Sequence, residues 1–288
     1  MPENLVPPME RLPRKLQVRS AKVPRLRTVA AALVAITLAL GAAGISAQQK
    51  KRGKKKPAPP PPAAVPFHAG ERLEYAAQWN KFVTAALLKL VVVDERDFFG
   101  RPAWHFQATA QTIDPVHMIF ALDDQFDSYT DAETLESRQY EMYLREQGKQ
   151  DDLVVPMATK PEPERAGTHV YLVMPGTQDP VGFLYGLRAH DWEKEPAMRV
   201  PVFDGRKFYE IEAKREAVGA SVTLTVGGTF VTTRIALKVF QGGQEMPNLK
   251  VWVSLSMDAA RVPVLIEAEA PFGTVRAEMT ARGGAAGD

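Results

Sequence analysis

The sequence predicts an all-β domain: an antiparallel β-barrel, or a strongly curved half-barrel sheet, of about 10–12 strands with one short helix. Three observations support this prediction. From Phe67 onward, short runs rich in branched and aromatic residues follow one another. Gly, Pro and Asp separate these runs, as at Gly227-Gly228, which is typical of hairpin turns. Several runs alternate apolar and polar residues, as strands with one face on a core do.

The predicted strands are joined by short turns along the whole domain. The alternation is strictest over residues 250–257, where Val251 and Val253 face one way and Trp252 faces the other. Residues 156–167 are polar and contain proline, so they are expected to form a loop. The segments expected as strands are 71–79, 84–93, 103–113, 125–130, 138–146, 169–174, 206–218, 221–226, 229–240, 250–257, 262–270 and 274–280.

One helix is predicted over residues 180–190. Asp179 can cap its first turn, and Pro180 suits the first helical position because proline lacks the amide hydrogen that this position leaves unpaired. This helix is expected to present one face, because four of its residues have helical spacing (i, i+3, i+4 and i+7): Val181, Leu184, Tyr185 and Arg188. A single helical turn is also expected near residues 117–122.

The N-terminus has the features of an export signal. Residues 28–47 carry no charge and follow seven Lys and Arg residues, and the segment ends in small residues. This pattern predicts a secretory signal peptide over residues 1–47, cleaved between Ala47 and Gln48. The alternative is an uncleaved inner-membrane anchor, because twenty uncharged residues are just long enough to span a bilayer. The domain is expected in the periplasm, or otherwise exported, in either case.

A basic, proline-rich linker is predicted over residues 48–66. Its like charges repel and its prolines favour extended conformations, so the composition cannot form a core. A single β-rich domain is expected over residues 67–282, and residues 283–288 are expected to be a disordered tail. The linker is interpreted as a solvated spacer, although a basic run could also contact anionic lipid headgroups, acidic polysaccharide or the domain's own acidic surface.

Charge and cysteine content exclude several classes of protein. Residues 1–66 hold 13 Lys and Arg against two Glu, whereas the remainder holds 23 basic and 32 acidic residues. The domain itself is therefore acidic, which argues against a nucleic-acid surface. The chain has no cysteine, which excludes disulfides, thiolate metal sites, cysteine nucleophiles and a lipid anchor on cysteine.

No motif for catalysis, for a metal or for a cofactor is found, so no metal or cofactor is expected and no catalytic residue is predicted. The five histidines form no metal-binding pair, and His105 is interpreted as a face-exposed or satisfied strand histidine. The acidic run from Asp123 to Asp131 lacks the glycine and the terminal glutamate of a calcium loop. Glu267 and Glu269 share a strand face, which a solvated outer surface explains better than a pair of catalytic carboxylates.

Three segments in order resemble a known family. They contain Asp124, Phe126, Ser128, Tyr129 and Asp131; then Asp179, Leu184, Tyr185 and Arg188; then Trp252, Asp258, Arg261, Pro263 and Gly273. Together they resemble the bacterial "domain of unknown function 3108" family over roughly residues 67–280. The resemblance implies an exported, mostly antiparallel β-barrel-like domain, and it brings no established activity and no catalytic residues. One departure is that residues 80–90 lack the glycines expected there.

Three hypotheses for function follow. The first is a non-enzymatic envelope protein that holds a hydrophobic or amphiphilic ligand, such as a lipid, inside the curved sheet. Tyr185, Arg188 and Trp252 are the predicted ligand-binding residues, although Arg188 could instead pair with Asp179 or Asp191. The second is a structural module that binds another envelope protein. The third, the least favoured, is a hydrolase acting on envelope polymer. Membrane contact is expected only through the N-terminal segment or the linker.

Overall fold

A computed structural model describes residues 65–80, 83–162, 165, 169–271 and 273–284. The predicted signal peptide, its cleavage site at Ala47 and Gln48, and all but the last two residues of the predicted linker lie outside this range. Within the described residues, no helix is both long enough and apolar enough to cross a membrane.

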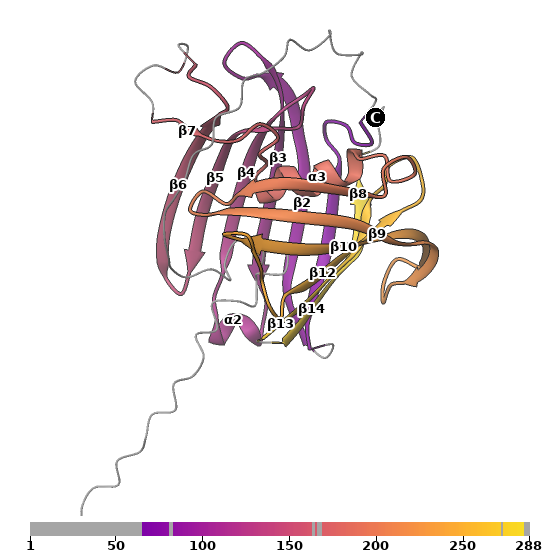
Figure 1. Ribbon diagram of the computed structural model, residues 1–288. Helices are drawn as coiled ribbons and strands as arrows, with labels where there is room; N and C mark the ends of the chain where they lie inside the picture. The colour runs from indigo at the N-terminus through magenta and orange to yellow at the C-terminus, as the bar shows by residue number, and fades with distance from the viewer. Residues whose placement is uncertain (1–64, 81–82, 163–164, 166–168, 272, 285–288) are drawn as a thin grey trace, which may run out of the picture.

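The predicted all-β fold is confirmed. Across the described residues, fourteen strands form one strongly curved, nearly all antiparallel sheet that is not closed into a barrel (Figure 1). Its strands are β1 (Arg72–Trp79), β2 (Val83–Asp97), β3 (Pro102–Thr112), β4 (Asp123–Asp131), β5 (Ser137–Glu146), β6 (Lys149–Ala158), β7 (Tyr171–Leu172), β8 (Ala197–Phe203), β9 (Phe208–Thr223), β10 (Thr229–Gln241), β11 (Gln244–Glu245), β12 (Lys250–Ser256), β13 (Pro263–Ala270) and β14 (Gly273–Gly283).

The sheet consists of two meanders, which are joined where the first strand of the domain, β1, pairs with the last, β14. The strand order is β7-β6-β5-β4-β3-β2-β1-β14-β13-β12-β10-β9-β8, with β11 paired to β10. The first and last strands, β1 and β14, are therefore neighbours, and Arg72 lies opposite Gly283. Because the sheet curves, β8–β10 cross in front of β2–β6 in Figure 1.

A short connecting segment spans the open side of the sheet. The amide of Gln178 donates to the carbonyl of Pro201 at 3.0 Å, and the amide of Phe203 donates to the carbonyl of Gln178 at 2.9 Å. The amide of Ser137 donates to the carbonyl of Thr177 at 3.0 Å. Residues 177–178 thus link β5 to the edge strand β8 and satisfy backbone groups that an edge would leave exposed.

The prediction of 10–12 strands is too low, for identifiable reasons. Strands β6 and β8 and the two-residue strand β11 were not expected, and residues 156–158 of the expected loop belong to β6. Strands β6 and β8 each contain a proline, Pro156 or Pro201, and proline weakens the pattern of a strand. Both strands lie near the edges of the sheet, where proline is tolerated. Conversely, the segments 206–218 and 221–226 form one strand, β9, which continues through Gly219.

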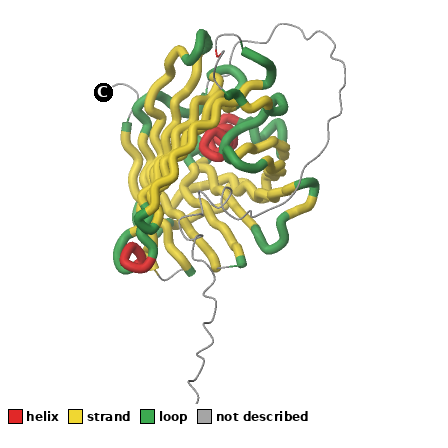
Figure 2. The backbone as a smooth tube through the Cα atoms, turned by 90° about the vertical axis from the view of Figure 1, so that its left-hand side faces the viewer, coloured by secondary structure: helices red, strands yellow, loops and turns green. Residues whose placement is uncertain are grey.

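The predicted helix is confirmed as α3 (Pro180–Ala189), and a single turn, α2 (Val116–Ile119), lies close to where a helical turn was expected. The expectation of one buried face on α3 is too narrow, because every residue from Pro180 to Arg188 is buried. Figure 2 shows this helix inside the curve of the sheet. Gly186 permits the close packing: a β-carbon there would lie 2.9 Å from the side-chain amide of Gln178.

Helix α3 contributes to both main parts of the core. Phe183, Leu184 and Leu187 pack in a cluster with β1, β2 and the C-terminal strands. Val181 and Tyr185 pack in a second cluster with β3–β6. The helix therefore fills the concave side of the sheet and connects its two halves.

The N-terminus of α3 is fixed by Asp179, as the sequence predicted. The side chain of Asp179, which is fully buried, accepts the amides of Val181 at 2.9 Å and Gly182 at 2.8 Å. It also accepts the hydroxyls of Ser128 on β4 and Ser137 on β5, both at 2.5 Å. One carboxylate thus caps the helix and ties it to two strands.

We expect Asp179→Ala to lower the free energy of unfolding by about 2–4 kcal/mol, because it removes the cap and leaves two buried hydroxyls without their acceptor. Urea unfolding would measure the change. Asp191→Ala is a matched control, since Asp191 accepts the amides of Glu193 and Lys194 in the same way but is exposed. A loss for Asp179→Ala no larger than that for Asp191→Ala would contradict this role.

Candidate functional site

Two of the three predicted ligand-binding residues lie together in the core. The Arg188 guanidinium donates to Glu71, from Nη1 to Oε1 at 2.6 Å and from Nη2 to Oε2 at 2.9 Å, and both side chains are 1% exposed. Its Nη2 also donates to the carbonyls of Pro66 at 3.2 Å and Ala260 at 3.0 Å. The guanidinium lies 5.3 Å from the ring centre of Tyr185.

The expected local partners of Arg188 are therefore wrong. Asp179 caps the helix, and Asp191 pairs with Lys194 at 2.7 Å. The actual partner, Glu71, immediately precedes β1 and lies 117 residues away in sequence. Such a pair is visible only once the fold has brought the ends of the domain together.

Tyr185 and Arg188 are enclosed rather than placed at an opening. Among the described residues, neither the Tyr185 hydroxyl nor the Arg188 Nε meets a hydrogen-bond partner, and both atoms are buried. Burial raises the pKa of Tyr185 even though the charge of Arg188 opposes this. A ligand would have to enter the core to reach them, so ligand binding at this position stays a prediction.

Trp252 lies apart from the other two predicted residues. Its neighbours Val251 and Val253 are buried in the core, so the alternation of β12 turns Trp252 to the outer face. There the Arg234 guanidinium lies 5.0 Å from its ring and also pairs with Glu267 at 2.8 Å. The structure does not bring Trp252 to Tyr185 and Arg188.

The family-like segments meet around α3. Ser128 binds Asp179, as described above. In the turn after β12, Asp258 accepts the amides of Ala260 and Arg261, both at 3.1 Å, and the hydroxyl of Ser256 at 2.7 Å. This turn presents the carbonyl of Ala260 to Arg188, and Arg261 donates to the carbonyl of His190 at 2.9 Å. These residues hold the helix in place.

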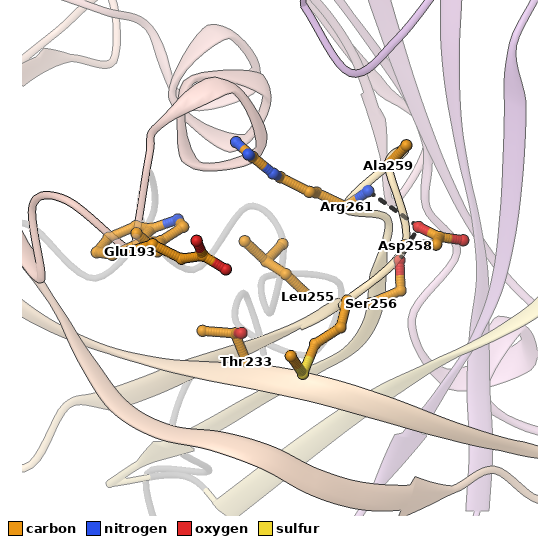
Figure 3. A pocket seen from close by; sticks show the side chains of 9 residues that line it. Glu193, Thr233, Leu255, Ser256, Asp258, Ala259 and Arg261 are labelled. Atoms are coloured by element: carbon orange, nitrogen blue, oxygen red, sulfur yellow. Dashed lines mark hydrogen bonds between the residues drawn. The ribbon is translucent and has the colours of Figure 1, made fainter.

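A small pocket of about 200 Å³ lies beside this turn (Figure 3). Trp192 and Leu255 provide apolar walls, while Glu193 and Asp258 are charged. In Figure 3, the side chain of Arg261 points away from Asp258 and toward the end of α3, where its carbonyl partners lie. The volume is below the range usual for ligand sites, roughly 300–1,000 Å³.

A larger groove lies on the opposite, outer face of β3, β4 and β5. Its volume is about 610 Å³, within the usual range for ligand sites. Its walls are almost entirely polar and include carboxylates, amides, hydroxyls and two tyrosine rings. The lining residues are His105, Gln107, Thr109, Asp123, Asp124, Gln125, Asp127, Tyr129, Glu141, Tyr143 and Arg145.

Asp127 is the centre of a hydrogen-bond network in this groove. Its carboxylate accepts His105 Nε2 at 2.7 Å, Gln107 Nε2 at 3.0 Å and Gln125 Nε2 at 2.6 Å. Burial by itself would raise the pKa of Asp127, but the hydrogen bonds from His105, Gln125 and Gln107 outweigh it and the pKa is lowered. Asp127 is thus held ionised, and its neighbours have fixed orientations.

Two further contacts order the groove. The His105 ring stacks on Tyr129 with 4.5 Å between ring centres and bonds to Asp127, so of the two predicted states, face-exposed or satisfied, the structure shows the satisfied one. Glu141 accepts the Tyr143 hydroxyl and the Gln139 amide, both at 2.5 Å. The side chains that line the groove are therefore arranged before any ligand arrives.

Asp124 borders the groove, but the alternation of β4 turns its side chain to the core side, opposite Ala110. It is 1% exposed, its Oδ1 accepts the amide of Arg145 at 2.8 Å, and its Oδ2 meets no donor among the described residues. Burial raises its pKa to about 6.

The sequence contained a signal for this groove that was interpreted differently. The strand expected over residues 125–130 is confirmed as part of β4, but the acidic run from Asp123 to Asp131 was considered as a calcium loop and rejected, whereas alternate residues of β4 face the groove. Polar residues at every second position also occur on β3 and β5. In the described part of the chain, no three His, Asp or Glu side chains are close enough to hold a metal ion.

Comparison with known proteins establishes the family. The model of the family described as "Protein of unknown function (DUF3108)" matches residues 74–280, and the chain belongs to that family. No significant match is found among curated proteins.

Two solved structures are similar. A β-barrel-like protein from Brucella abortus, of domain of unknown function DUF1849, is 10% identical with a TM-score of 0.45, over 76% of this chain and 99% of that one. A protein from Bacteroides fragilis with a YmcC-like fold is 10% identical with a TM-score of 0.34, over 76% of this chain and 98% of that one.

We expect Glu71→Ala to lower the free energy of unfolding by about 3–5 kcal/mol, because it leaves the Arg188 cation buried without its counterion. Replacing both partners, Glu71→Leu with Arg188→Met, should recover most of the loss. Arg282→Ala is the control, since Arg282 lies 3.9 Å from Glu71 but is partly exposed. Equal losses for Glu71→Ala and the double variant would refute the argument.

We also expect Asp124 to make stability depend on pH. Its pKa is higher in the folded state than in the unfolded state, so folding binds protons between roughly pH 4 and pH 6. This contribution is fully present below about pH 4 and is lost as the pH rises through 6. The free energy of unfolding, measured in urea, should therefore fall between pH 5 and pH 8. Asp124→Asn should make this decline smaller by about 1 kcal/mol. Asp123→Asn, at an exposed neighbour, should leave it unchanged; an unchanged decline in Asp124→Asn would contradict the assignment.

Proposed function

We propose that this protein is an exported domain of the cell envelope that binds a neutral, hydroxyl-rich saccharide in the outer groove of β3–β5 without converting it. The observation that carries the proposal is the ordered polar network around Asp127. The envelope location rests on the predicted signal peptide or anchor over residues 1–47 and on the linker over residues 48–66.

The chemistry of the groove favours hydroxyl groups. A sugar hydroxyl offers one donor and two acceptor positions. Carboxylates such as Asp127 and Glu141 can accept a hydrogen bond from it, while the amides of Gln107 and Gln125 and the Arg145 guanidinium can donate hydrogen bonds to its oxygen. Tyr143 adds apolar ring surface, whereas the ring of Tyr129 is stacked against Phe98 and His105. Fixed partners reduce the ordering cost of binding.

The charge of the groove disfavours anions. Three carboxyl side chains, those of Asp123, Asp127 and Glu141, face the groove against one arginine, and the Arg145 guanidinium also pairs with Asp152. Phosphate-bearing ligands and anionic lipid headgroups would meet repulsion there. A neutral saccharide avoids this penalty.

The concave side of the sheet gives less support to an amphiphilic ligand. Helix α3 occupies it, and Phe183 and Leu187 on that helix are 1% and 0% exposed. An acyl chain would have to displace these side chains, whereas the outer groove is open.

Calorimetric titration with β-1,4-linked oligomers of N-acetylglucosamine and of glucose tests the proposal. We expect one series to bind, and Glu141→Ala and Tyr143→Ala each to weaken it about tenfold, through loss of roughly 1.4 kcal/mol each. Lys214→Ala, on the exposed surface of β9, is the control and should bind normally. No binding by either series, or equal binding by all variants, would overturn the proposal.

A further inference from the structure

The outer groove has a neighbour on the same face of the sheet. A second hollow of about 220 Å³ lies on the outer face of β14, β1 and β2, and it also reaches β3. Glu74, Leu87, Lys89, Gln111 and Thr280 contribute to its lining. Thr109 lines both hollows, so the two meet at β3.

The register of the sheet joins the two hollows in one line. Glu74 on β1 lies opposite Lys89 on β2, and Lys89 lies opposite Thr109 on β3. Thr109 then lies opposite Gln125 on β4, and Gln125 opposite Tyr143 on β5. This cross-strand row, Glu74 to Tyr143, runs perpendicular to the strands.

All five side chains of the row point away from the core. Their sequence neighbours Tyr75, Leu88, Ala110, Phe126 and Met142 are buried in the core clusters, and alternate residues of a strand face opposite sides. The row is therefore a continuous polar track on the outer surface rather than a set of unconnected sites.

The second hollow is chemically suited to the same kind of ligand. Lys89 and Gln111 offer polar groups, and Leu87 offers an apolar side chain that is 49% exposed. A sugar ring presents both hydroxyl groups and an apolar C–H face, so it could use both kinds of contact. The acidic character of the first hollow is weaker here, because Lys89 accompanies Glu74.

We propose that the two hollows form one elongated site and that the ligand is a linear oligosaccharide chain lying across the strands. This inference rests on the proposed function and adds the length and direction of the ligand. The track crosses five adjacent strands from β1 to β5. Because neighbouring strands lie about 4.8 Å apart, it extends over roughly 19 Å, which is longer than a single sugar ring requires.

The test is the dependence of affinity on oligomer length. Calorimetric titrations would use dimers and hexamers of β-1,4-linked N-acetylglucosamine and of glucose with the full chain. We expect the hexamer of the bound series to bind roughly tenfold or more tightly than its dimer, because the second hollow adds contacts without a second association cost. The double variant Lys89→Ala with Gln111→Ala should reduce the hexamer to the affinity of the dimer and leave the dimer unchanged.

The outcomes separate the two proposals. A hexamer that binds no more tightly than the dimer, or that is unaffected by the double variant, overturns the elongated site but leaves saccharide binding intact. Absence of binding by every oligomer overturns both. Lys214→Ala controls for charge removal on an outer face, and circular dichroism checks that the double variant, which alters only surface side chains, remains folded.

Discussion

The buried ion pair between Arg188 and Glu71 is the constraint on which the rest of the structure depends. It joins the end of α3 to the start of β1, and the Ala260 carbonyl brings the turn after β12 to the same guanidinium. Removing both charges from water is costly, and the bidentate geometry with two further carbonyl acceptors offsets that cost. With Asp179 fixing its other end, α3 is held at both termini inside an open sheet. The edge strands of the sheet therefore need not pair with each other to close a barrel, because α3 makes the core continuous.

This arrangement decides which surface is available for function. A curved sheet of this size could enclose a ligand, but here its concave side contains a helix that is buried along its length. The outer face remains, and its order comes from strand register. Because β1–β5 pair with little irregularity in the region of the track, polar residues spaced two apart on each strand align into rows. The network around Asp127 is a product of that alignment.

Local signals were sufficient to predict much of this fold. Asp179 and Pro180 correctly indicated the start of the helix. The alternation over residues 250–257 correctly placed Trp252 on the other face of its strand from Val251 and Val253. Pairings between distant segments were not predictable: nothing near Arg188 indicates Glu71, so nearby aspartates were the natural candidates. The edge strands with Pro156 and Pro201 were missed because their own composition argues against strands. The groove needed three strands in register, and from sequence the aspartates of β4 formed only an acidic run.

The central claim is that the interior is a closed, helix-filled core and that recognition takes place on the outer face. The most direct measurement is the mapping of backbone amide shifts by NMR during titration with the β-1,4-linked N-acetylglucosamine hexamer and, in parallel, the glucose hexamer. The account predicts shifts concentrated on β1–β5 near the row from Glu74 to Tyr143, with the amides of α3 unchanged. Shifts concentrated on α3, around Tyr185 and Arg188, would place the ligand inside the sheet and contradict it.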